Sequence, residues 1–227
     1  MRPESIGRGR YVDSTAALRS YTTTFPLTET LSEGGIWLTG QRDGRDWTNV
    51  VTAGGIAYGT QSGSSPTFDD SVACLSAAFP ANQYCEVTVH IGGGLSATSE
   101  ISLLLRATIS TGVCLCYGTN YAYDGSYSHF GRWPGFITSN GADYVTLASN
   151  LTNPVGALQD GDIFQAQITG YTFTTWHVRG ATRTLINTGT DTDAAKIASG
   201  KPGFGTWNNG HAATNAIGAT RFYAVEI

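Results

Sequence analysis

Short runs of alternating apolar and polar residues fill the chain from about residue 24 to its end. In the run 84–91, YCEVTVHI, the residues Cys85, Val87 and Val89 share one face and polar residues occupy the other. Such alternation is typical of antiparallel strands that have one buried and one solvated face. Similar runs, separated by Gly-rich or Asn-Gly turn signals, predict strands at 36–39, 47–52, 56–60, 71–79, 101–108, 113–118, 128–133, 144–148, 163–169, 172–178, 182–187, 203–207 and 221–227. The pattern predicts an all-β, two-sheet antiparallel sandwich.

The first residues do not share this pattern. We predict an N-terminal arm at 1–23 and a single β-sandwich domain at 24–227. The arm is rich in arginine, with Arg2, Arg8, Arg10 and Arg19. It is either a solvated terminus or, through residues 1–21, a device for self-assembly or for docking on a protein scaffold. In the body the one helical signal is 191–197, where Thr192 or Asp193 provides a capping side chain.

Several segments carry a family resemblance. They are FPLTETLSEGGIW (25–37), SEISLLLRA (99–107), LQDGDIFQAQITGYTFTTWHVRG (158–180), DTDAAKIASGKPGFGTW (191–207) and ATRFYAVEI (219–227). Together they resemble the concanavalin A-like lectin and glucanase (LamG-like) superfamily. The resemblance implies a jelly-roll sandwich in which the terminal strand pairs with the first. It leaves function open, because this scaffold hosts lectins, binding modules, hydrolases, lyases and virion proteins.

Composition and charge narrow the classes of partner. The net charge is −4 over 227 residues, and only two of the 13 basic residues are lysines. Nucleic-acid binding needs a basic footprint interleaved with aromatic residues, which the body of the chain lacks. There is no apolar run of about 18 residues, so we expect no membrane span. No signal peptide is visible at the polar N-terminus.

Four cysteines stand at positions 74, 85, 114 and 116. The C-x-C spacing of the last two differs from the C-x-x-C of common zinc and redox sites. The favoured interpretation is four reduced, buried thiols. A disulfide between Cys74 and Cys85 is the main alternative.

Catalytic motifs are missing from the sequence. A glycoside hydrolase needs two carboxylates across a cleft, and hydrolases of this fold carry them as E-x-D-x-E on one strand. That pattern is absent, and Glu86, Glu100 and Glu226 are isolated acids in or beside predicted strands. The lyase motifs R-x-E-x-R, Q-I-H and Y-x-K-x-G-x-Y are absent too. The missing motifs favour a non-catalytic protein but do not exclude an enzyme.

Aromatic residues give the best functional signal. The segment 119–133, TNYAYDGSYSHFGRW, mixes rings with amide, acidic and basic side chains. Glycans present apolar C–H faces that stack on rings, and hydroxyls that need polar partners. The alternative is that these rings are core residues of an ordinary hairpin. The candidate glycan-binding residues are Tyr123, Tyr127, Trp133 and Trp207 for stacking, and Asn120, Asp124 and Arg132 for hydrogen bonding.

Turn aspartates are the candidate metal ligands. Asp69, Asp70, Asp191 and Asp193 suit calcium chemistry, although they also fit ordinary turn and capping roles. No cofactor is required, and calcium is the one metal to test.

Three functions follow from these observations. The first is a non-catalytic structural and recognition protein that contacts glycans and is displayed on a larger assembly, such as a phage virion or a cell surface. The alternatives are a soluble carbohydrate-binding module or lectin, and a polysaccharide lyase or glycoside hydrolase with an unrecognised site. Few lysines and abundant Thr and Gly favour an extracellular or virion surface, as for a decoration protein.

Overall fold

The computed structural model describes residues 18–40, 48–60, 70–95, 99–110, 113–135, 145–150, 154–208 and 216–227. These residues form sixteen strands and one 3-10 turn, η1 (Glu33–Gly35), and the strands pair in two antiparallel sheets. The all-β sandwich predicted from the alternation is therefore confirmed.

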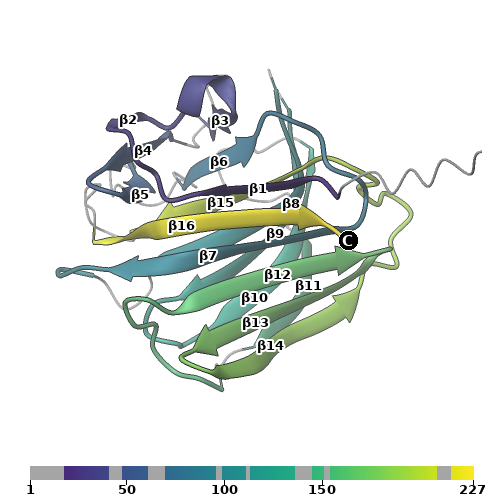
Figure 1. Cartoon of the computed structure of the whole chain (residues 1–227). Helices are drawn as coiled ribbons and strands as arrows, with labels where there is room; N and C mark the ends of the chain where they lie inside the picture. Colours follow the sequence, from purple (N-terminus) through teal and green to yellow (C-terminus); the bar gives the residue numbers. More distant parts are fainter. Residues whose placement is uncertain are drawn as a thin grey trace, which may run out of the picture.

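The two sheets form the layers of the sandwich, with the nine-stranded sheet in front and the seven-stranded sheet behind it in Figure 1. The nine-stranded sheet has the order β14-β13-β12-β7-β16-β5-β4-β2, and β1 pairs with β16 beside that path. Its strands are β1 (Ser20–Thr23), β2 (Glu29–Thr30), β4 (Val50–Ala53), β5 (Ile56–Gly59), β7 (Gln83–Ile91), β12 (Ile163–Thr169), β13 (Thr172–Arg179), β14 (Thr182–Thr190) and β16 (Ile217–Glu226).

The seven-stranded sheet has the order β11-β10-β9-β8-β15-β6-β3. Its strands are β3 (Trp37–Thr39), β6 (Ser71–Leu75), β8 (Glu100–Ser110), β9 (Val113–Ala122), β10 (Ser128–Gly135), β11 (Val145–Asn150) and β15 (Lys201–Trp207). Its central strand β8 begins in SEISLLLRA (99–107), one of the segments that carried the family resemblance.

The inner faces of the sheets meet in one hydrophobic core. Cys85, Val87 and Val89 of β7 enter it, on the face that the alternation predicted. From the other sheet, Phe204 packs edge-on against Trp37, with ring centroids 5.6 Å apart. Large aromatic rings add buried area and oriented ring contacts, so this core needs no disulfide or metal.

The first strand corrects the predicted domain boundary. β1 pairs with β16 in register, Ser20 opposite Val225 and Thr23 opposite Phe222. The first and last strands therefore pair, as the family resemblance implied. The sheet begins at Ser20, inside the segment predicted as an arm, and residues 1–17 lie outside the described part of the chain.

The helical turn predicted at 191–197 does not form, which corrects the sequence-based expectation. Instead, Asp191 Oδ1 accepts a hydrogen bond from the Asp193 amide at 2.9 Å. Asp193 Oδ1 accepts one from the Ala195 amide, also at 2.9 Å. Short acidic side chains that bind nearby amides compete with helix formation, so the segment runs as two successive turns.

The described thiols are buried and free. Cys74, Cys85 and Cys116 have no disulfide partner, so the alternative of a Cys74–Cys85 bond is wrong. Burial raises the pKa of Cys74 to about 12, which keeps it an unreactive thiol at neutral pH. The side chain of Cys114 lies outside the described part of the chain.

A buried arginine joins several loops at one end of the sandwich. Arg106, on β8, is 1% exposed and has a φ of 52°, which is rare for a residue other than glycine. Its guanidinium donates to the carbonyls of Ala81 at 2.7 Å, Ile197 at 2.8 Å and Gly170. It also lies over the ring of Tyr171, 5.1 Å from the centroid. One side chain thus satisfies carbonyls from three separate segments.

Candidate functional site

The outer face of the seven-stranded sheet has an apolar part and a polar part. Side chains alternate along β8, so Ile101 and Leu103 enter the core whereas Glu100 and Leu104 face outward. The apolar part is a second buried cluster formed mainly by Val72, Cys74, Leu104, Ala107, Ile109 and Cys116. The polar part, which we call the Glu100 cluster, consists of Glu100, Asn120, Tyr127, His129 and Trp207.

Strand register brings the Glu100 cluster together. Trp207 of β15 lies directly opposite Glu100, and Ala122 of β9 lies opposite Glu100 on the other side. The Ala122 amide donates to the Tyr127 carbonyl at 3.0 Å, so Tyr127 continues this row. Because Ala122 has only a methyl group, the Tyr127 side chain reaches across it to Glu100. In the next row, His129 lies opposite Asn120.

Glu100 is the centre of the cluster. Its Oε1 accepts a hydrogen bond from the Tyr127 hydroxyl, and its Oε2 accepts one from Asn120 Nδ2 at 2.6 Å. Burial raises the pKa of Glu100, and these two hydrogen bonds oppose the rise without cancelling it. The residue is 8% exposed and is the first residue of β8.

The rings of Tyr127 and His129 lie beside each other, with centroids 4.9 Å apart. Burial and the negative charge of Glu100 raise the pKa of Tyr127, and Asp124 and Asp70 add to the rise. Burial lowers the pKa of His129, whose Nδ1 is buried without a hydrogen-bond partner among the described residues. His129 is therefore a neutral ring at neutral pH, and Tyr127 is a protonated hydroxyl.

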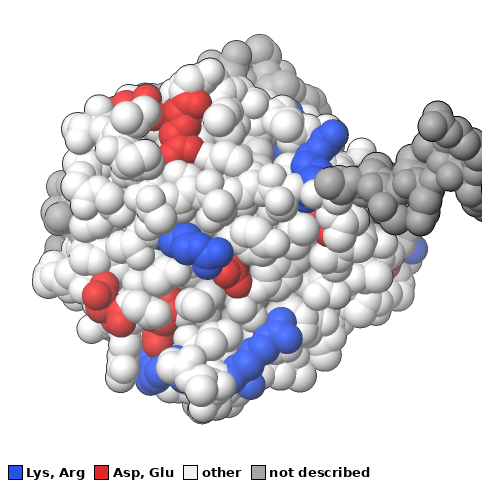
Figure 2. Space-filling model, in the orientation of Figure 1, with Lys and Arg blue, Asp and Glu red and all other residues white. Residues whose placement is uncertain are grey.

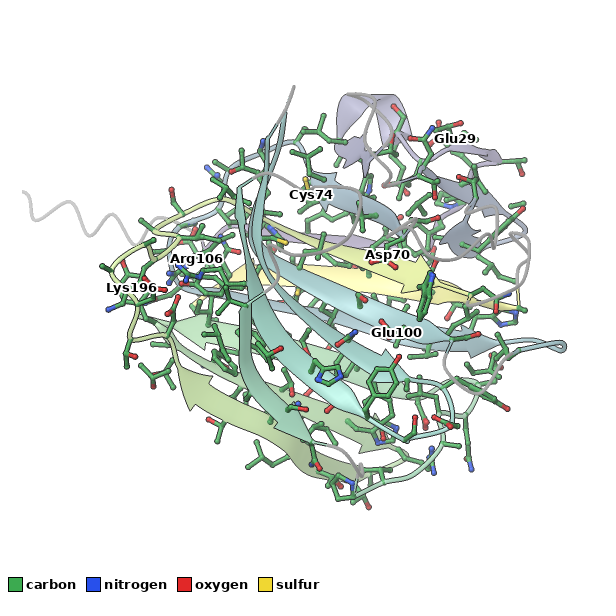
Figure 3. All side chains as sticks on the ribbon, turned by 180° about the vertical axis from the view of Figure 1, so that it is seen from behind. Glu29, Asp70, Cys74, Glu100, Arg106 and Lys196 are labelled. Carbon is green, nitrogen blue, oxygen red and sulfur yellow. The ribbon has the colours of Figure 1, made fainter. Side chains whose placement is uncertain are left out.

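A further acid, Asp70, belongs to this side of the molecule. It immediately precedes β6, and Figure 3 shows it near Glu100 on the side of the seven-stranded sheet that faces the viewer. Its charge acts on Tyr127, as does that of Asp124 in the turn before β10. The polar end of this face thus combines aromatic rings, an amide and carboxylates.

Three of the predicted glycan-binding residues meet in the Glu100 cluster, namely Asn120, Tyr127 and Trp207. Tyr123 packs against the main core instead. Asp124 is exposed and accepts a hydrogen bond from the Ser126 amide at 2.8 Å, the role of a turn former. Of Trp133 only the backbone is described.

Arg132 points into the sandwich rather than toward the cluster, which corrects its predicted role. It is 2% exposed, and its Nη2 lies 2.6 Å from Asp193 Oδ2. Its Nε lies 3.6 Å from Asp191 Oδ2. A buried guanidinium paired with two carboxylates has a structural role.

The predicted calcium ligands that the structure describes, Asp70, Asp191 and Asp193, do not come together at one place. Asp191 and Asp193 bind Arg132 and nearby amides, whereas Asp70 lies on the outer face near Tyr127. Among the residues that the structure describes, no group of three or more His, Cys, Asp or Glu is arranged to hold a metal ion. Asp69 lies outside those residues. Asp191 and Asp193 therefore serve the turns at 191–195 and the ion pair with Arg132.

The sequence analysis treated Glu100 as an isolated acid and did not include His129 among the candidate residues. The sequence did hold one signal that Glu100 is unusual. It is an acidic residue placed directly before the apolar residues of β8. The sequence held no signal of its contact with Tyr127, since that contact depends on the register of β9 with β8 and on the small size of Ala122.

The cluster predicts an unusual effect of pH on stability. A carboxyl whose pKa is raised by folding stabilises the fold below its unfolded-state pKa, and that contribution is lost as pH rises through the folded-state pKa. Glu100→Gln should therefore melt as high as the parent or a few degrees higher at pH 8, where about 1 kcal/mol moves the melting temperature by roughly 2–4 °C. Its advantage should shrink at pH 4. Thermal melts at both pH values test this, and a variant whose deficit is largest at pH 8 would contradict it.

The outer face of the other sheet is organised differently. There, Glu86 accepts hydrogen bonds from Gln165 at 2.9 Å and from Arg221 at 2.8 Å. Arg183 lies over the Trp176 ring at 3.8 Å from its centroid. Figure 2 shows that charged side chains are sparse and scattered on this face. Glu86 is thus paired with a cation on this face, and Trp176 is covered by Arg183, which makes this face the weaker candidate for a ligand.

In the part of the chain that the structure describes, no helix is long and apolar enough to cross a membrane.

Comparisons with known proteins support the fold. No family model and no curated protein sequence matches the chain. Solved structures do match. The carbohydrate-binding module CBM66 from Bacillus subtilis aligns with a TM-score of 0.52 at 17% identity, over 84% of this chain and 91% of that one. Beta-agarase A in complex with oligoagarose aligns with a TM-score of 0.57 at 10% identity, over 92% of this chain and 94% of that one.

A third similar structure comes from a virus. The CBM2 module of the evolved Dit of Lactobacillus casei BL23 phage J-1 aligns with a TM-score of 0.51 at 14% identity, over 92% of this chain and 98% of that one. Lectins and a glucanase are also among the matches. The chain therefore has the concanavalin A-like jelly-roll fold. At these identities the likeness shows the fold alone, and function must be argued from the site.

Proposed function

We propose that the protein is a non-catalytic glycan-recognition protein that binds its ligand at the Glu100 cluster. The observation that carries the proposal is the convergence of Trp207, Tyr127 and Asn120 around a buried carboxylate on the outer face of the seven-stranded sheet. Aromatic rings suit the C–H faces of sugars, and the amide and carboxylate suit their hydroxyls. Similar structures include proteins named as carbohydrate-binding, as bound to oligoagarose and as bound to a fucoside.

A lyase function fits this site less well. A tyrosine that removes a proton from a sugar needs a pKa near the working pH. Burial and neighbouring acids raise the pKa of Tyr127 instead. The same carboxylates would repel the uronate that such a lyase binds.

The wider role that we propose is display on a larger assembly, such as a phage virion or a cell surface. The similarity to a module of a phage protein supports this role. In this role the part of the predicted arm that precedes β1, residues 1–17, would attach the domain to the assembly. The alternative is a soluble lectin or binding module that uses the same face.

Light scattering separates these two roles. Because β1 belongs to the sheet, the truncation should end at residue 17, which leaves the pairing with β16 intact. A full chain that forms a defined oligomer, with a monomeric truncated form, supports display through the arm. Two monomers would favour the soluble alternative.

Aromatic substitutions test the glycan site itself. We expect Trp207→Ala to weaken binding of a glycan identified by array screening by at least tenfold, because it removes the ring beside Glu100. Tyr127→Phe, which removes only the hydroxyl, should weaken it about three- to tenfold. Trp176→Ala, on the outer face of the other sheet, is the matched control and should bind normally. Isothermal titration of each variant measures the effect, and equal affinities for the Trp207 variant and the parent would reject this site.

A further inference from the structure

Glu100 differs from the other buried acids of the chain. Among the described residues, four acidic side chains are buried: Glu86, Glu100, Asp162 and Asp191. Three of them have an arginine within ion-pair distance, Glu86 with Arg221 at 2.8 Å, Asp162 with Arg179 at 2.6 Å and Asp191 with Arg132 at 3.6 Å. Glu100 has none in the part of the chain that the structure describes, and it accepts hydrogen bonds from the neutral donors of Tyr127 and Asn120.

A buried carboxylate that lacks a cation costs stability, and the raised pKa of Glu100 reflects that cost. Departures from the rule that buried charges are paired are expected at functional sites, where stability is given up for a ligand. A missing counter-charge on an otherwise aromatic and amide-lined site indicates the chemistry of the group that would complete it.

The surrounding field has the same sign. Three carboxylates, Glu100, Asp124 and Asp70, act together on the Tyr127 hydroxyl, and each of them raises its pKa. His129, the one basic side chain in the Glu100 cluster, is held neutral because burial lowers its pKa. Anionic sugars would meet repulsion here, and a cationic sugar would meet attraction.

We infer that the Glu100 cluster selects glycans that carry a free amino group, with Glu100 accepting the ammonium and Trp207 stacking on the sugar ring. This inference rests on the proposed glycan-binding function and names the ligand class of the same site. Hydrogen bonds between an ammonium and a carboxylate are shorter and stronger than those between neutral groups. Trp207 is directly opposite Glu100 in the sheet, so one hexosamine can contact both side chains.

The test compares tetrasaccharides that differ in charge. Isothermal titration at pH 6 and low salt would use a β-1,4-linked glucosamine tetrasaccharide, its fully N-acetylated form and cellotetraose. We expect the dissociation constant of the amino tetrasaccharide to be at least tenfold lower than those of the two neutral ones. Added salt should reduce this preference, since it screens charges at a partly exposed site.

Glu100→Gln keeps the shape of the side chain and removes its charge, so it should bring the three dissociation constants within about threefold of one another. Glu226→Gln, the same chemical change at the end of β16, is the matched control and should keep the full preference. A thermal melt confirms that both variants are folded.

The outcomes separate this inference from the proposed function. Equal binding of neutral and amino tetrasaccharides by the parent, or a preference that survives in Glu100→Gln, would overturn the selectivity and leave glycan binding standing. Binding of neutral glycans without any binding of the amino tetrasaccharide would do the same. Failure to bind any tetrasaccharide or any glycan on an array would overturn both.

Discussion

Arg106→Met is expected to lower the free energy of unfolding by about 3–5 kcal/mol, a large part of the roughly 5–15 kcal/mol that holds a domain together. The guanidinium is buried, and it satisfies the carbonyls of Ala81, Ile197 and Gly170. Methionine fills a similar volume but leaves all three carbonyls without that donor. Each buried carbonyl that loses its partner costs about 1–3 kcal/mol.

Chemical denaturation measures this effect if the variant folds. Should it fail to fold, Arg106→Lys keeps the charge with fewer donors and is expected to show a smaller loss. Arg183→Met is the matched control, because Arg183 also lies over an aromatic ring but on the exposed face of β14. Exposed pairs of this kind contribute about 1 kcal/mol or less. Similar losses for the two methionine variants would show that Arg106 does not join the loops as described.

Gly203→Ala is the second large effect, with an expected loss of about 3 kcal/mol or failure to fold. Gly203 lies in β15 between β6 and β8. A Cβ atom at this position would lie 2.2 Å from the Ala73 carbonyl oxygen and 2.8 Å from the Cys74 Cα, so the backbones of β15 and β6 would have to separate. Both contacts are to backbone, which cannot move aside as the end of a flexible side chain can.

Gly93→Ala is its control. A Cβ atom at Gly93 meets nothing within 4 Å, so the change should alter stability by less than about 0.5 kcal/mol. Denaturant titration of the two variants gives the comparison. If Gly203→Ala were as stable as Gly93→Ala, the close packing of β15 against β6 would be contradicted.

The fold could be predicted largely because strand alternation is a local signal. The period of two along β7 identified which residues enter the core, and the structure confirms that assignment. The failed prediction at 191–197 shows the limit of local signals. Capping residues for a helix and for a turn are the same short acids, and here Asp191 and Asp193 bind nearby amides in turns.

The site could be predicted only in part, because its composition depends on pairing between strands. Arg132 was predicted to hydrogen-bond a glycan, yet its side chain is buried and its partners Asp191 and Asp193 lie far along the chain. Likewise, nothing near Glu100 in the sequence indicates that Tyr127 reaches it across Ala122. Local pattern identified the aromatic segment, and the tertiary register decided which of its side chains meet.

The most direct test of glycan binding at the Glu100 cluster is the mapping of amide chemical shifts in isotope-labelled protein during titration with a bound oligosaccharide. Binding at this cluster predicts that the largest shifts fall at Glu100, Asn120, Tyr127 and Trp207. Small shifts there, with the largest ones around Trp176 on the outer face of the nine-stranded sheet, would contradict it.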